Sequence, residues 1–106
     1  MAHLHIAFCT DGIFPLSTGG MQRHTRLLAE HLAGFEGVTI TVLHPHAPGQ
    51  FQASLGIREV HVPDIDTSRL YLRELWRYSG RMATALHAEM ERPGGPEVVL
   101  SQGFCI

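Results

Sequence analysis

The chain has 106 residues, a formal net charge of −2 at pH 7 and two cysteines. Its length fits one domain with one core. The charge gives no general attraction for nucleic acid or an anionic membrane, no apolar run approaches the ~20 residues of a membrane span, and the first residues lack a signal-peptide pattern. We therefore expect a cytoplasmic globular domain without a nucleic-acid partner.

The composition also excludes some chemistry. All eight strongly basic side chains are arginine, so the chain has neither the lysine of a phosphate-loop NTPase nor one that forms a Schiff base. Cys9 and Cys105 are too few and too far apart for a metal motif or a disulfide framework. Buried, reduced thiols are expected instead.

The first third of the chain predicts a strand, a loop and a helix. Leu4–Cys9 is a short apolar run, residues 10–20 are rich in turn formers, and a helix is expected over Gly20–Ala33. Gly34 follows, where a glycine is favoured after a helix. The residues expected to face the core recur at helical spacing: Met21, Thr25, Leu28 and Leu32.

The remaining chain predicts three strands and a second helix. Val38–Leu43 and Ile57–Val62 are rich in β-branched residues, and Glu97–Ser101 has the continuous apolar run of a strand covered on both faces. Asp66 or Ser68 can cap a long helix that a Pro-Gly-Gly-Pro segment ends. The apolar stripe expected to be buried on this helix is Leu72, Leu75, Trp76, Ala83, Leu86 and Met90.

This order of elements predicts an α/β fold: a Rossmann-like, open and mainly parallel sheet with helices on both faces. We expect the spatial strand order 3-2-1-4. The first and fourth strands are then neighbours whose connections leave toward opposite faces, and ligands of open α/β sheets bind at such a switch point. The expected crevice lies between residues 10–20 and 101–104.

Gly19 and Gly20 stand where the first loop opens into the helix. A residue without Cβ lets a phosphate approach the backbone, where unpaired amides and the helix dipole favour negative charge. The pair predicts an anion site, with tight packing at the strand–helix junction as the alternative. NAD is not expected, because the glycine spacing is not Gly-x-Gly-x-x-Gly and the second strand ends without an acidic residue.

The segment Phe14–His24, Phe-Pro-Leu-Ser-Thr-Gly-Gly-Met-Gln-Arg-His, continued by residues 27–32 and 38–45, resembles part of a known family. That family is the nucleotide-sugar-dependent family four of retaining glycosyltransferases, and the resemblance is to the amino-terminal domain of its two-domain GT-B fold. It covers nearly the whole chain, but only the first third is distinctive. In the family the glycine loop faces the interdomain cleft and approaches the donor diphosphate, a role that the match implies for Gly19 and Gly20.

Five further residues are candidates for sugar or acceptor contacts: Thr10, Asp11, His24, Gln102 and Gly103. Asp11 fits an ordering role in its loop equally well. His24 lies within the resembling segment. Many family members carry a histidine near the reacting sugar after the fourth strand, whereas Gln102 occupies that neighbourhood here and can hydrogen-bond but not transfer a proton. No catalytic residue is identified.

Two other patterns have less specific interpretations. The eight histidines form no cluster with cysteine or acidic partners at a known ligand spacing, so no metal is expected. Arginines recur at every fourth residue of the second predicted helix, at Arg69, Arg73, Arg77 and Arg81. Such a ridge can dock on anionic lipid, but a solvated face is the interpretation that we favour.

The resemblance implies more than residues 1–106 contain. The family binds most of the nucleotide sugar with a carboxy-terminal domain, and a complete first sheet has roughly six strands. We therefore expect a fragment of a hexosyltransferase-like enzyme that uses a nucleotide-diphosphate sugar and a hydroxyl acceptor. It should be inactive alone, since its cleft has one wall, and should dimerise through an exposed sheet edge. A nucleotide-sugar epimerase of the same architecture and a non-catalytic α/β binding or interaction module remain alternatives.

Overall fold

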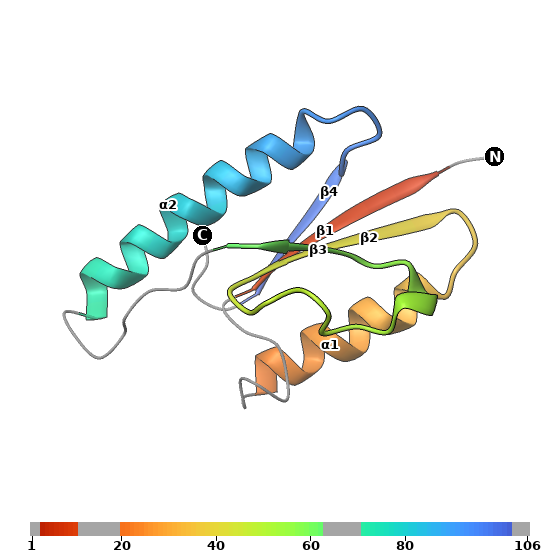
Figure 1. Ribbon diagram of the computed structural model, residues 1–106, viewed down its shortest axis with the longest axis horizontal. Helices are drawn as coiled ribbons and strands as arrows, with labels where there is room; N and C mark the ends of the chain where they lie inside the picture. The colour runs from red at the N-terminus through yellow and green to blue at the C-terminus, as the bar shows by residue number, and fades with distance from the viewer. Residues whose placement is uncertain (1–2, 11–19, 63–70, 103–106) are drawn as a thin grey trace.

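The structure is a computed structural model that describes residues 3–10, 20–62 and 71–102 (Figure 1). Within them, a four-stranded sheet has the order β3-β2-β1-β4, and every neighbouring pair is parallel. The strands are β1 (Leu4–Thr10), β2 (Val38–His44), β3 (Arg58–His61) and β4 (Val98–Gln102). The helices are α1 (Gly20–Ala33), α2 (Tyr71–Met90) and the short 3-10 helix η1 (Ala53–Leu55). The predicted α/β class, Rossmann-like topology and strand order are confirmed.

The two long helices lie on opposite faces of the sheet (Figure 1). β1 is central, with β2 on one side and β4 on the other, so that Ile6 aligns with both Ile40 and Val98. Successive side chains of a strand point to opposite faces. Ile6 and Phe8 therefore pack toward α1, whereas Ala7 and Cys9 pack toward α2.

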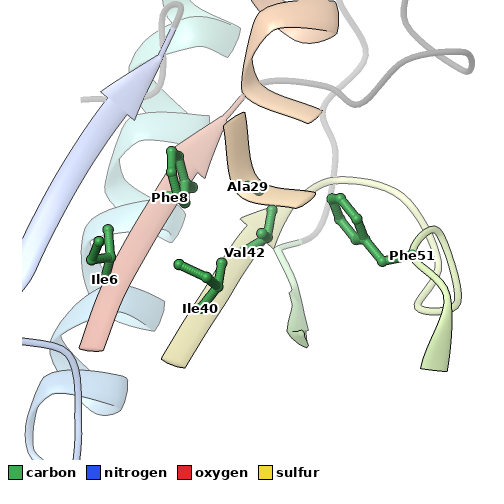
Figure 2. Packing of buried hydrophobic residues seen from close by; sticks show 6 residues of the cluster. All are labelled: Ile6, Phe8, Ala29, Ile40, Val42 and Phe51. Carbon is green, nitrogen blue, oxygen red and sulfur yellow. The ribbon is translucent and has the colours of Figure 1, made fainter. Parts of the chain in front are cut away.

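The core beneath α1 agrees with the predicted helix face. Figure 2 shows its six buried residues, which come from β1, β2, α1 and the loop after β2: Ile6, Phe8, Ala29, Ile40, Val42 and Phe51. Thr25 is fully buried, and Leu28 and Leu32 pack against this cluster half-buried. The side chain of Met21 lies outside the described part of the chain.

The core beneath α2 corrects the predicted apolar stripe. Its buried residues are Ala7, Cys9, Leu43, Val62, Tyr78 and Met82. Trp76 is 83% exposed and Met90 48% exposed, and Ala83 is exposed as well, whereas Leu86 does pack against the cluster. The side chains of Leu72 and Leu75 are outside the description.

The prediction for α2 followed its most apolar residues, but its inner face contains two polar ones. Tyr78 and Glu89 are buried at 2% and 6% exposure. The Tyr78 hydroxyl donates to the Thr10 carbonyl over 2.8 Å, and Glu89 accepts from Arg58 at 2.6 Å and from Arg92 at 3.1 Å. A polar group that keeps its hydrogen bonds can be buried at little cost, so hydrophobicity alone misplaced the buried face by about a third of a turn.

The predicted strand bounds differ from the observed ones by at most one residue, and α1 has the bounds predicted. The capping residues proposed for α2, Asp66 and Ser68, lie outside the described residues. The sequence did not predict η1. Gly56 ends it in the left-handed conformation, with φ of 67°, and donates its N–H to the Ala53 carbonyl over 3.1 Å.

Polar contacts fix the amino ends of the strands. The two ring nitrogens of His5 lie 2.7 Å from the Gly94 carbonyl and 2.7 Å from the Thr41 hydroxyl. Glu97 forms a backbone bond to the His5 carbonyl and accepts the His5 N–H with its side chain. These bonds hold the turn between α2 and β4 against β1, at the edge opposite the predicted site.

Candidate functional site

The carboxyl ends of β1 and β4 lie side by side, because Thr10 and Gln102 are register partners in the parallel pairing. From β1 the chain order runs through β2 to β3 on one side, whereas β4 lies on the other side and follows α2. The strand order thus reverses between β1 and β4, as expected for a ligand-binding switch point.

The described candidate residues lie on β1, on β4 and on the helix that follows β1. Gly20 is the first residue of α1, the helix that follows β1, and His24 is exposed one turn further along. Thr10 ends β1 and Gln102 ends β4. Asp11, Gly19 and Gly103 lie outside the described residues. The fold thus brings Thr10 and Gln102 together and places Gly20 at the start of the helix after the same strand.

The first turn of α1 suits an anion electrostatically. Its 14 residues are enough to give a helix dipole, and no acidic side chain occupies the first turn. The amides of this turn have no intrahelical acceptors. Gly20 lacks a Cβ, so a bound oxygen anion can approach the backbone here more closely than at any other residue type.

Thr10 has a positioning role rather than an open surface. It is 1% exposed, and its carbonyl accepts the hydroxyl of Tyr78 over 2.8 Å. Tyr78 comes from the middle of α2, so this bond joins the helix on one face to the end of the central strand. The role of Tyr78 could not be predicted from the sequence, because nothing in its spacing indicates which backbone group its hydroxyl meets.

A second polar group, the His44–Glu59 cluster, lies at the carboxyl end of β2 and beside it on β3. We define it as His44, Glu59 and the amides of His46, Gly49 and Gln50. His44 Nε2 is 2.8 Å from Glu59 Oε1, and the His46 N–H donates to His44 Nδ1 over 3.1 Å. The Gly49 and Gln50 amides donate to the Glu59 carboxylate over 2.9 and 3.0 Å. The cluster therefore holds the loop after β2 against the sheet.

The charges of this cluster are tuned by burial and by hydrogen bonds. Burial lowers the pKa of His44 from its ordinary value of 6.5, although the hydrogen bond and the charge of Glu59 act in the opposite direction. Burial alone would raise the pKa of Glu59, but hydrogen bonds from Gln50, His44 and Gly49 outweigh it and bring the pKa below 4.5. At neutral pH, Glu59 is ionised and His44 is uncharged.

Glu89 forms a triad with Arg58 and Arg92 at the amino-terminal edge of the sheet, opposite the edge that holds the switch point. Its hydrogen bond with Arg58 lowers the pKa of Glu89 below 4.5, and the charge of Arg92 acts in the same direction. The triad links the first residue of β3 to the last turn of α2. It supports the fold rather than the switch point.

The described residues contain no group of three or more histidine, cysteine or acidic side chains that could hold a metal. Cys9 is a buried thiol, as predicted, and Cys105 lies outside the description. Of the predicted arginine ridge, Arg77 and Arg81 are exposed on α2, where they line an open groove with Gly80, Thr84, Ala85 and Ala88. Among the described helices, none has the length and apolarity to cross a membrane.

No protein-family model, curated protein or solved structure matches the chain. The structure itself defines the class: a Rossmann-like α/β domain whose switch point lies between β1 and β4. Any more specific function follows from the residues at that point and from the sequence resemblance.

Proposed function

We propose that the chain is the acceptor-side amino-terminal domain of a retaining, GT-B-type glycosyltransferase acting in the cytoplasm. In the whole enzyme a sugar moves from a nucleotide diphosphate to a hydroxyl acceptor. One observation carries the proposal: the helix that follows β1 opens on Gly20, and the same strand ends beside β4 at the switch point. The Phe14–His24 motif, with its resemblance to family four, supplies the reaction class.

The chemistry assigned to these residues is electrostatic. Transfer of the sugar leaves negative charge on the departing diphosphate, and oriented backbone amides stabilise such charge without reorganising. Gly19 and Gly20 provide these amides. Since Thr10 is buried and bonded to Tyr78, it fixes the end of β1 from which the glycine loop departs.

Gln102, at the end of β4, is assigned a hydrogen bond to a sugar or acceptor hydroxyl. Its amide has both a donor and an acceptor, which suits a hydroxyl, but it has no proton to exchange near neutral pH. Asp11, His24 and Gly103 are proposed as further contacts with the sugar or acceptor. A second domain supplies the other wall of the cleft, most of the donor contacts and the exclusion of water.

The proposal is tested by nucleotide binding to the 106-residue chain. We expect uridine or guanosine diphosphate to bind weakly, with a dissociation constant on the order of 1 mM, since one wall alone makes few contacts. In amide NMR spectra, the largest shifts should fall on Gly20 and on the ends of β1 and β4. Shifts confined to other surfaces, or no binding of either nucleotide, contradict the assignment.

A pair of matched variants isolates the glycine at the helix start. Gly20→Val should weaken nucleotide binding at least about tenfold, because its side chain occupies the approach to the amides. Gly80→Val is the control, since a Cβ at Gly80 on α2 meets no atom within 4 Å. Equal binding by the two variants contradicts the assignment. In a longer protein with a second domain, Gly20→Val should also abolish sugar transfer.

A further inference from the structure

Three side chains hold the loop after β2 to the sheet: the rings of His44 and His61 and the carboxylate of Glu59. His44 is the last residue of β2, and its side chain is fully buried. Glu59 lies on the neighbouring strand β3, in register with Val42, and 9% of its side chain is exposed. The loop partners of His44 and Glu59 are backbone amides, so these contacts depend on the acceptor capacity of the two side chains.

The hydrogen bonds fix the protonation of His44. The His46 N–H points at Nδ1 over 3.1 Å, so Nδ1 must carry a lone pair. The single proton of the neutral ring is then on Nε2, where it is donated to Glu59 Oε1 over 2.8 Å. A proton added at Nδ1 would face the His46 N–H, and two donors cannot form a bond.

We propose that His44 is a proton-operated switch that releases the start of the loop at residues 45–52 when its Nδ1 is protonated. The proton goes to Nδ1, the His46 N–H loses its acceptor, and the backbone at His46 moves away from the ring. The ring keeps its Nε2–H bond to Glu59, now as an imidazolium–carboxylate pair. This inference rests on the loop contacts alone and is independent of the proposed function.

Several charged and titratable groups act on His44 from the surrounding elements. Glu59 favours its protonated form, whereas His46 in the loop and His61 on β3 disfavour it when charged. His61 is itself held by the loop, since its Nδ1–H donates to the His46 carbonyl over 2.9 Å. From α1, Arg26 lies 5.0 Å from the ring centroid of Phe51 and 3.5 Å from Glu30. α2 lies on the other face of the sheet.

The release has two stages. Protonation of His44 breaks the contact at His46, while the Gly49 and Gln50 amides remain bound as long as Glu59 is ionised. The ordinary pKa of glutamate, 4.5, lies below that of histidine, 6.5, and both the loop hydrogen bonds and the charge of a protonated His44 lower the pKa of Glu59, so we expect the second stage at a lower pH. Only then does Phe51, which is 7% exposed beneath α1, lose the loop that holds it (Figure 2).

The test is a pH titration of the 106-residue chain, followed by NMR of the imidazole rings and backbone amides. The His46 amide and the His44 ring should titrate with one shared midpoint below 6.5, and the Gly49 and Gln50 amides should follow at a lower midpoint. Exchange of the His46 amide, corrected for its intrinsic pH dependence, should rise at least about tenfold across the first midpoint. A single common midpoint for all three amides contradicts the two-stage switch.

Two variants separate the ring from its neighbours. His44→Gln should abolish the first transition, because glutamine does not titrate in this range. His46→Ala should keep it, since alanine retains the backbone N–H. The reverse pattern overturns the proposal. If His44→Gln does not fold, the nitrogen chemical shifts of the His44 ring in the unaltered chain provide the test. A proton on Nδ1 at neutral pH would also overturn the proposal.

Discussion

The two halves of the carboxyl edge of the sheet use polar groups differently. Beneath the loop after β2, the acceptors of His44 and Glu59 are directed at the amides of the chain's own loop. In the β1–β4 half, the helix that follows β1 begins with Gly20, and the first amides of a helix in general have no acceptor within it. The comparison indicates that the β2–β3 half holds its own loop, whereas the proposed function assigns the ligand to the β1–β4 half.

The largest effect on stability is expected from a substitution of Glu59, in the β2–β3 half. Glu59→Gln removes the charge that accepts two loop amides and the ring of His44, and we expect a loss of about 2–3 kcal/mol in the free energy of unfolding. Urea denaturation followed by circular dichroism measures it. Glu91→Gln is the matched control: the Glu91 side chain is 68% exposed and meets His87 at the surface, so its change should stay within about 0.5 kcal/mol. Equal effects would show that the cluster does not stabilise the fold.

The corresponding change in the β1–β4 half is Tyr78→Phe. It leaves the buried Thr10 carbonyl without the hydroxyl at 2.8 Å, for which we expect a loss of about 1–2 kcal/mol. Nucleotide binding should weaken as well, because the end of β1 is less firmly held. Trp76→Phe, at a site 83% exposed on the same helix, should change neither quantity. Unchanged stability in Tyr78→Phe would remove the role assigned to this bond.

The pH dependence of stability also distinguishes the two halves, because we expect protonation to destabilise the chain through groups of the β2–β3 half. A histidine whose pKa is lower in the folded chain binds fewer protons there than in the unfolded chain, so its contribution is present above pH 6.5 and is lost as the pH falls through the folded-state pKa. Glu59 and Glu89, with pKa values below 4.5, add a second loss at lower pH. Urea midpoints measured from pH 8 to pH 4 should decline in this order.

His44→Gln provides the control for the first part of this decline. The variant should give a flatter curve just below pH 6.5 than the unaltered chain, with the decline at lower pH retained. A stability that rises as the pH falls below 6.5 would mean that His44 binds its proton more tightly in the folded chain, contrary to its burial.

The smallest effect concerns the outer edge of the β1–β4 half. In the described part of the chain, β4 pairs with β1 alone, and Val98 is 39% exposed. Open edges pair with one another, so we predict weak dimers at concentrations of about 1 mM, detected by light scattering. Val98→Lys should reduce this association, since a charged side chain disfavours edge pairing. A monomer at every concentration contradicts the prediction.

The fold was predictable because its signals are local and agree with one another. Leu4–Thr10 and Val38–His44 are apolar runs between turn formers, and the strand order follows from the handedness and reversal rules of open sheets. The buried face of α2 was not predictable in the same way. Tyr78 and Glu89 are buried because of partners on β1 and β3, and such partners are visible only in three dimensions.

The candidate site was likewise predictable in part. The start of a helix at Gly20 and the neighbouring ends at Thr10 and Gln102 follow from the pattern of elements. The His44–Glu59 cluster did not: the sequence separates its two side chains by 15 positions, and no motif links them. In the sequence, His44 is one of eight histidines that form no cluster at a known ligand spacing.

The chain has a single tryptophan, Trp76, and the surface of α2 leaves its indole in water. Its emission in the native protein should therefore resemble that of the denatured chain, which makes intrinsic fluorescence a poor reporter of unfolding. The same indole is a sensitive reporter of contact, because any molecule that covers this side of α2 should shift its emission to shorter wavelengths while the circular dichroism stays constant.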